Sequence, residues 1–195
     1  MPESDLIFIP SRFTFGDYLR YGSIAANSPI MNDIIKKASD GLPTLGICNG
    51  FQILTESGLL PGTLIRNDCL SFLCKTVSIR VENNETKFSN KYKQKEIINI
   101  PIAHNEGNFF ANEDTLKKIK DSNQIIFKYC DQNGEVNEKS NPNGSIENIA
   151  GITNEKGNVL GMMPHPERAT CKITKLTDGE NLFKSIYEFL SWIKL

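Results

Sequence analysis

One cysteine stands in a sequence setting that would make it a nucleophile. Cys48 is the centre of Gly46-Ile47-Cys48-Asn49-Gly50, which is the thiol form of the G-x-S-x-G nucleophile elbow. The elbow needs small residues on both sides, because its tight turn strains the backbone and leaves no room for side chains. The sulfur would then lie at a helix N-terminus, which favours the thiolate, and the Asn49 N–H would face the oxyanion of a tetrahedral intermediate. The alternative is a small buried cysteine in a glycine-rich turn.

A thiol nucleophile needs a base, and the sequence contains two histidines. His165 follows an expected strand, and Pro166 separates it from Glu167. The proline fixes φ and forces an extended bend at this pair. A carboxylate beside an imidazole can set its tautomer and stabilise the imidazolium. The favoured interpretation is therefore a triad of Cys48, His165 and Glu167.

His104 is the competing base. It follows a segment in which apolar and polar residues alternate, and its spacing would let it pair with Glu106 equally well. A hydrogen-bonded structural or interface histidine is the favoured interpretation of this residue.

Length and composition narrow the class of protein around these residues. The chain has 195 residues, and its 22 Lys and Arg against 23 Asp and Glu give a net charge of -1. This length fits one domain spanning residues 1–195, and the charge balance argues against nucleic-acid binding. No apolar run reaches the roughly 18 residues of a membrane span, and the acidic start lacks the pattern of a signal peptide. The five cysteines show neither a CxxC pair nor metal-ligand spacing, so we expect a reduced, cytoplasmic chain without a metal site.

The first sixty residues predict two strands, each followed by a helix. Leu6–Ile9 is a short apolar run typical of a buried parallel strand, and Pro43–Ile47 is a second one. The first helix should begin at Ser28-Pro29 and end at Gly41, and the second should run from the elbow to Gly58. The apolar stripe of the first helix is expected at Ile30, Ile34, Ile35 and Ala38.

The remaining sequence predicts more antiparallel material. Alternating apolar residues indicate strands over Val77–Val81 and Ile98–Ile102, and turn residues join Ile149–Thr153 to Asn158–Met163 as a hairpin. A short helix near residues 116–120 and a strand at 125–127 lie between them, and a last helix covers Glu180–Lys194. We expect a three-layer α/β domain with a mixed sheet.

Two motifs together resemble the class I, triad-type glutamine amidotransferases. They are Gly46-Ile47-Cys48-Asn49-Gly50-Phe51-Gln52 and Pro164-His165-Pro166-Glu167-Arg168. Further stretches resemble the branch of this family that serves purine synthesis, and the resemblance runs from about Asp5 to the C-terminus. These stretches are Phe15–Arg20, Arg80–Asn84, Pro101–Asn108 and Asn141–Ser145.

The resemblance implies a fold and an activity. The fold is flavodoxin-like, three-layered and doubly wound, with a mostly parallel sheet and an antiparallel hairpin extension, in one type 1 amidotransferase domain. Cys48 is implied as nucleophile, His165 as base and then acid, and Glu167 as the residue that orients it. Asn49 and Gln52 are implied beside the bound glutamine.

The same resemblance implies partners. Glutamine would be hydrolysed to glutamate and ammonia, and the ammonia would pass to a synthetase subunit that makes formylglycinamidine ribonucleotide. ATP and Mg would be used by that synthetase, a small accessory subunit would join the complex, and this chain would hold no cofactor of its own.

Two departures from the family pattern leave other functions open. Ser11 and Arg12 follow Pro10 where the family has two glycines, at the strand that would donate to the oxyanion and border the substrate. The family's N-terminal strand–helix–strand is also not found, and we expect its absence to leave a gap in the core. One alternative is therefore a non-catalytic subunit of the same complex. Another is a stand-alone thiol hydrolase, of the γ-glutamyl peptidase or DJ-1 type, that needs no partner.

Overall fold

The computed structural model describes residues 2–11, 25–173 and 175–193. Arg12 and the segment Phe15–Arg20, both singled out in the sequence, lie outside the described residues. The described helices are α2 (Pro29–Ser39), α3 (Asn49–Glu56), α4 (Glu113–Asp121) and α5 (Glu180–Ile193), with 3-10 turns η2 (Glu138–Ser140), η3 (Ile146–Asn148) and η4 (Pro166–Arg168). The described strands are β1 (Ile7–Ile9), β2 (Thr44–Ile47), β3 (Thr63–Ile65), β4 (Leu73–Val81), β5 (Ile97–His104), β6 (Asn108–Phe110), β7 (Ile125–Cys130), β8 (Ile149–Thr153) and β9 (Val159–Met162). No helix in these ranges is both long enough and apolar enough to span a membrane.

Seven strands form one mixed sheet in the order β1-β2-β9-β8-β7-β4-β5, and β3 and β6 pair as a separate small sheet. Only the β1–β2 and β2–β9 pairings are parallel, whereas the other four neighbouring pairs are antiparallel. The expected mostly parallel sheet is therefore wrong. For β8 and β9 the reason is local connectivity, because the turn that joins them spans only residues 154–158 and a parallel pair needs a longer crossover.

The described sheet is continuous, with β1 as its outermost strand. β1 pairs directly with β2, and the register places Ile7 opposite Thr44 and Ile9 opposite Gly46. Ile7 and Ile9 lie on the face of β1 that packs against the core. Phe8 points to the other face and is 42% exposed, because β1 is the outermost strand of the described sheet.

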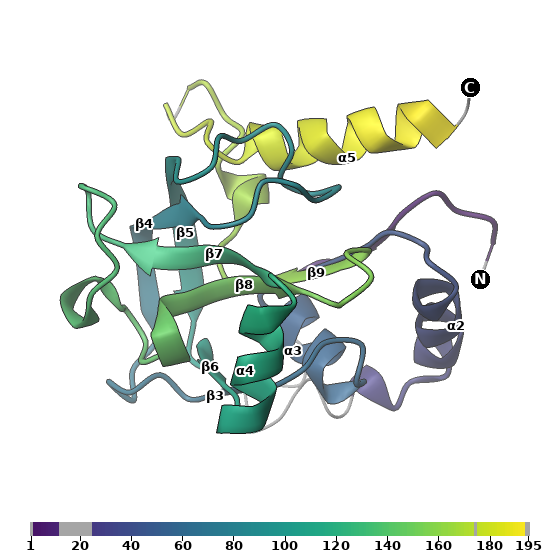
Figure 1. The fold of residues 1–195 in the computed structure, drawn as a ribbon, viewed down its shortest axis with the longest axis horizontal. Coiled ribbons are helices and arrows are strands. Elements are labelled where there is room, and N and C mark those ends of the chain that lie inside the picture. The colour runs from purple at the N-terminus through teal and green to yellow at the C-terminus, as the bar shows by residue number, and fades with distance from the viewer. Residues whose placement is uncertain (1, 12–24, 174, 194–195) are drawn as a thin grey trace.

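The first helix begins where its sequence predicts, with Ser28 at the N-cap and Pro29 as its first residue. Its buried residues are Met31, Ile34 and Ala38, whereas Ile30 is mostly exposed. Met31 thus takes the core position that the sequence assigned to Ile30, one residue along the helix. In Figure 1, α5 lies on the opposite side of the sheet from α3 and α4, so both faces are covered.

The long loop between β4 and β5 holds α5 in place. The Tyr92 hydroxyl donates to the Asp178 carbonyl at 2.8 Å and accepts from the Leu182 N–H at 3.1 Å. The Lys91 N–H donates to the Ser185 hydroxyl at 3.0 Å. A buried tyrosine thereby provides an acceptor for one of the N–H groups in the first turn of the helix.

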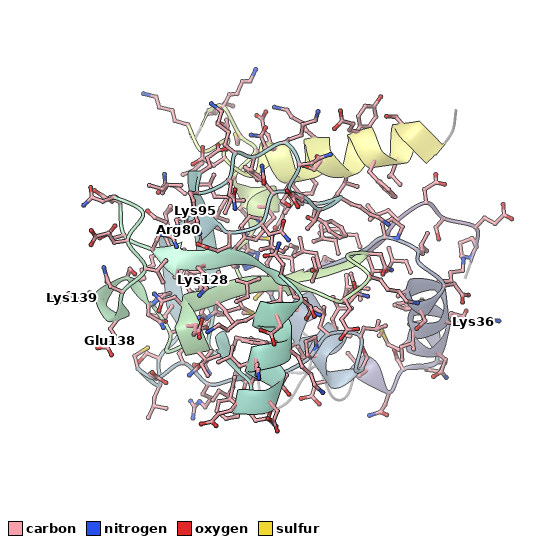
Figure 2. The ribbon with its side chains drawn as sticks, viewed as in Figure 1. Lys36, Arg80, Lys95, Lys128, Glu138 and Lys139 are labelled. Carbon is pink, nitrogen blue, oxygen red and sulfur yellow. The ribbon has the colours of Figure 1, made fainter. Side chains whose placement is uncertain are left out.

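Charged side chains on one side of the sheet pair with each other. Arg80 and Lys95 both contact Glu82, and Lys128 is 3.0 Å from Glu147. Figure 2 shows Arg80, Lys95 and Lys128 gathered near β7. These three basic side chains each have an acidic partner, so they do not form an unpaired basic patch.

Candidate active site

The elbow around Cys48 has the strained geometry that its sequence predicts. Cys48 joins β2 to α3, with φ 53° and ψ -105°, and its side chain is buried. A non-glycine residue held at such angles costs about 1–3 kcal/mol and persists where the surroundings fix it. A Cβ on Gly46 would lie 2.7 Å from the Gly50 backbone, and one on Gly50 would lie 2.1 Å from the Ile9 carbonyl oxygen. The two flanking glycines are thus required by close backbone contacts.

His165 and Glu167 form a hydrogen-bonded pair after β9. The His165 Nδ1 and the Glu167 Oε1 are 2.7 Å apart, and the imidazole is fully buried. Pro166 begins the short turn η4, which brings the carboxylate back to the ring. This pairing leaves Nε2 as the ring nitrogen available to a reacting group.

Cys48 and Glu167 both act on the charge of His165. Burial lowers the pKa of His165, but its interactions with Cys48 and Glu167, which include the negative charges of both groups, outweigh it and raise the pKa to about 9. The site therefore stabilises an imidazolium, which is the form that arises when the ring takes a proton from a thiol. Nε2 has no partner at ordinary hydrogen-bond distance among the described residues.

The free edge of β5 completes the site, and this contribution was missed by sequence analysis. The sheet curls so that its last strand, β5, reaches the carboxyl ends of β2 and β9; in Figure 1, β4 and β5 run across the direction of β7–β9. The Pro101 carbonyl accepts from the His165 N–H at 2.8 Å, and the Ala103 carbonyl accepts from the Cys48 Sγ at 3.7 Å. These contacts use backbone atoms, which leave no mark in residue types.

Three of the four residues predicted to border the substrate form a chain of polar contacts. The Ser11 hydroxyl is 3.5 Å from the Asn49 Oδ1, and the Asn49 Nδ2 donates to the Gln52 Oε1 at 3.3 Å. The Gln52 Nε2 in turn donates to the Glu106 carbonyl at 2.8 Å. The fourth, Arg12, lies outside the described residues.

His104 lies beside this site with a different partner from the one its spacing suggested. Its Nδ1 is 3.0 Å from the Asn67 Oδ1, so its ring contacts an amide in place of a carboxylate. Burial, together with the positive charge of His165, lowers the pKa of His104 to about 4. A ring that holds a proton so weakly is a poor general base at neutral pH, which leaves His165 as the better candidate.

The geometry supports nucleophilic chemistry on an acyl group. The nucleophile stands at the first turn of α3, where backbone N–H groups have no intrahelical acceptor and can bind an oxyanion. The candidate base interacts electrostatically with it and is held by a carboxylate. The roles of Cys48, His165 and Glu167 remain predictions at this point.

The chain matches a known family over nearly its whole length. The family model for the CobB/CobQ-like glutamine amidotransferase domain matches residues 2–190. The chain is also 56% identical, over 181 residues, to the phosphoribosylformylglycinamidine synthase subunit PurQ of Synechocystis, covering 93% of this chain and 81% of that protein. These matches confirm the family that the two motifs predicted.

Two solved structures also resemble this chain in fold. The structure of PurLQS from Thermotoga maritima superposes with a TM-score of 0.85 at 42% identity, covering 97% of this chain and 82% of that one. The glutaminase domain of Trypanosoma brucei CTPS, with bound acivicin, gives a TM-score of 0.56 at 13% identity, covering 94% and 71%. The second likeness concerns the fold alone.

Proposed function

Because the chain belongs to the CobB/CobQ-like glutamine amidotransferase family, we propose that it is a glutaminase subunit of phosphoribosylformylglycinamidine synthase. It hydrolyses glutamine to glutamate and ammonia, and the ammonia is used in purine biosynthesis. The observation that carries this proposal is the meeting of the strained Cys48 elbow with the His165–Glu167 pair, in a chain 56% identical to a PurQ subunit.

The reaction runs through a thioester on Cys48. Nε2 of His165 takes the thiol proton, and the sulfur attacks the carboxamide carbon of glutamine. The N–H of Asn49 donates to the resulting oxyanion. His165 returns its proton to the amide nitrogen, the C–N bond breaks, and ammonia leaves.

Water then completes the cycle. It attacks the thioester and gives one proton to His165, the C–S bond breaks, and His165 reprotonates the sulfur as glutamate leaves. Glu167 holds the ring in one tautomer, with Nδ1 protonated, and stabilises the imidazolium that forms twice in this sequence.

The remaining roles follow from the relatives. The PurLQS structure supports a complex with a synthetase subunit and a small accessory subunit, and ATP and Mg belong to the synthetase. Ser11, Asn49 and Gln52 border the glutamine, and the chain is one amidotransferase domain of the cytoplasm. Its β1, β2 and β9 with the helices around them form a flavodoxin-like, doubly wound core, to which the antiparallel strands are added.

Reconstitution with the synthetase and accessory subunits tests this function. The complex should make formylglycinamidine ribonucleotide from either glutamine or ammonium. With Cys48→Ala, the glutamine-dependent rate should be lost while the ammonium-dependent rate remains, because the synthetase site is untouched. Lys36→Ala is the matched control, since Lys36 is exposed on α2 and extends away from the molecule in Figure 2. A glutamine-dependent rate that survives Cys48→Ala contradicts the proposal.

A further inference from the structure

His104 is a buried titratable side chain to which the proposed reaction gives no role. His104 is 3% exposed, and its Nε2 has no hydrogen-bond partner among the described residues. A buried polar atom without a partner costs about 1–3 kcal/mol, so such atoms in native proteins call for an explanation.

The contacts of Asn67 determine which nitrogen of His104 carries the proton. The Asn67 Nδ2 donates to the carbonyls of Ser71 and His104, both at 2.9 Å, so the amide orientation is fixed. The Asn67 Oδ1 accepts from the Gly107 N–H at 3.0 Å and must also accept from His104 Nδ1. Nδ1 is therefore the protonated nitrogen, and Nε2 carries a lone pair.

The ring is held rigidly beside the reacting groups. A Cβ on Gly107 would lie 2.3–2.6 Å from three atoms of the imidazole, so the ring rests directly on the Gly107 backbone. Ala103 precedes His104 in the chain, and its carbonyl accepts a hydrogen bond from the Cys48 Sγ. The positive charge of His165 contributes to the low pKa of His104. The unpartnered lone pair thus belongs to a fixed ring, one residue beyond the carbonyl that Cys48 contacts and within the electrostatic influence of His165.

Among the reacting atoms, the departing nitrogen is a group that can use such an acceptor. It has two N–H donors as a carboxamide and three as ammonia, and Cys48 and His165 act on the carbon and on the nitrogen lone pair. We propose that the Nε2 of His104 accepts a hydrogen bond from the nitrogen that glutamine loses, both before and after the C–N bond breaks. This inference rests on the proposed glutaminase function and adds a substrate contact to it.

The acceptor is also suited to ammonia because it is not an acid. Since burial keeps the pKa of His104 near 4, the ring stays neutral at the pH of the cell. A protonated histidine here would convert ammonia to ammonium, which lacks the lone pair that the synthetase reaction needs. His104 can therefore hold ammonia without inactivating it.

Two substitutions test the roles of the two ring nitrogens separately. In His104→Asn, the amide nitrogen takes the place of Nδ1 and keeps the bond to Asn67, but nothing replaces Nε2. In His104→Gln, the longer side chain places an oxygen acceptor near the position of Nε2. Both are assayed in the reconstituted complex with glutamine and with glutamate γ-methyl ester, whose leaving group has no N–H.

We expect His104→Asn to lower kcat/KM for glutamine relative to the ester by roughly 10-fold, the value of one hydrogen bond to the reacting group. His104→Gln should restore most of this preference. Equal losses on both substrates, or an unchanged ratio in His104→Asn, overturn the inference. If the unsubstituted complex hydrolyses neither substrate through Cys48, the proposed function fails instead, so the two failures are distinguishable.

NMR of the full chain labelled with [15N]histidine supplies a second test that does not depend on His104→Asn folding. His104 Nε2 must give the signal of an unprotonated nitrogen. That signal must shift when glutamine binds to the Cys48→Ala protein, which cannot turn the substrate over. A protonated Nε2, or a signal that glutamine binding leaves in place, overturns the inference.

Discussion

Replacing Glu167 by glutamine removes the charge beside His165 and preserves the shape of the side chain. In the structure the Glu167 Oε1 is 2.7 Å from His165 Nδ1, and the imidazole is fully buried. A hydrogen bond to an ionised partner is stronger than one to a neutral amide. We therefore expect Glu167→Gln to lower the pKa of His165 and to slow formation of the thioester.

The magnitude follows from the pKa of His165. Against the effect of burial, Cys48 and Glu167 raise this pKa from 6.5 to about 9, which corresponds to about 3 kcal/mol of stabilisation of the imidazolium. The Glu167 side chain is 33% exposed, so water screens its share, and we assign it about 1–2 kcal/mol. This predicts a kcat about 5- to 30-fold lower with an unchanged KM, measured as glutamate release by the reconstituted complex.

Folding stability should respond to the same charge. Because the folded pKa of His165 lies above its unfolded value, its contribution to stability is complete below about pH 6.5 and is lost as the pH rises toward 9. The free energy of unfolding should fall across this window, and it should fall less in Glu167→Gln. Denaturant titrations at several pH values measure this, with Lys139→Ala, an exposed residue at the outer edge of the structure in Figure 2, as control. Unaltered kcat together with unaltered pH dependence in Glu167→Gln would refute the reasoning.

Four further substitutions test the packing and hydrogen bonding of the fold by urea unfolding. Gly50→Ala should cost about 1–3 kcal/mol, because its Cβ meets the Ile9 carbonyl at 2.1 Å, whereas Gly58→Ala, in open space at φ +75°, should cost about 1 kcal/mol; equal costs would contradict the close contact. Tyr92→Phe should cost about 1–2 kcal/mol by leaving a helix N–H unpaired, and an unchanged stability would exclude that role. Asn158→Ala should cost about 2–3 kcal/mol by removing two buried hydrogen bonds, to carbonyls 2.8 and 3.1 Å away, and a cost below 0.5 kcal/mol would refute this.

Local features of the site could be predicted from sequence because they depend on neighbouring residues. The flanking glycines fixed the turn at Cys48, and Pro166 fixed the bend that joins His165 to Glu167. The antiparallel strands β4, β5, β8 and β9 were also predicted, since β4 and β5 alternate apolar residues and a short turn joins β8 to β9.

Long-range pairing could not be predicted in the same way. The small sheet of β3 and β6 joins three-residue strands far apart in sequence, and strands this short give no clear periodicity. The mostly parallel sheet was wrong because the family resemblance outweighed the alternation visible in the middle of the chain. Closure of β5 on the site depends on how far the sheet curls, which no single segment encodes. The contact of His104 with Asn67 could not be predicted for the same reason, because the two residues are 37 positions apart in the sequence.

The most direct test of the account is to trap the intermediate. The reconstituted complex is mixed with glutamine and quenched in acid within the first turnover, and its peptides are examined by mass spectrometry. The account predicts a glutamyl adduct on Cys48, absent from Cys69, Cys74, Cys130 and Cys171, and lost in Cys48→Ser. Glutamine turnover with no adduct on Cys48, or with the adduct on another residue, would contradict it.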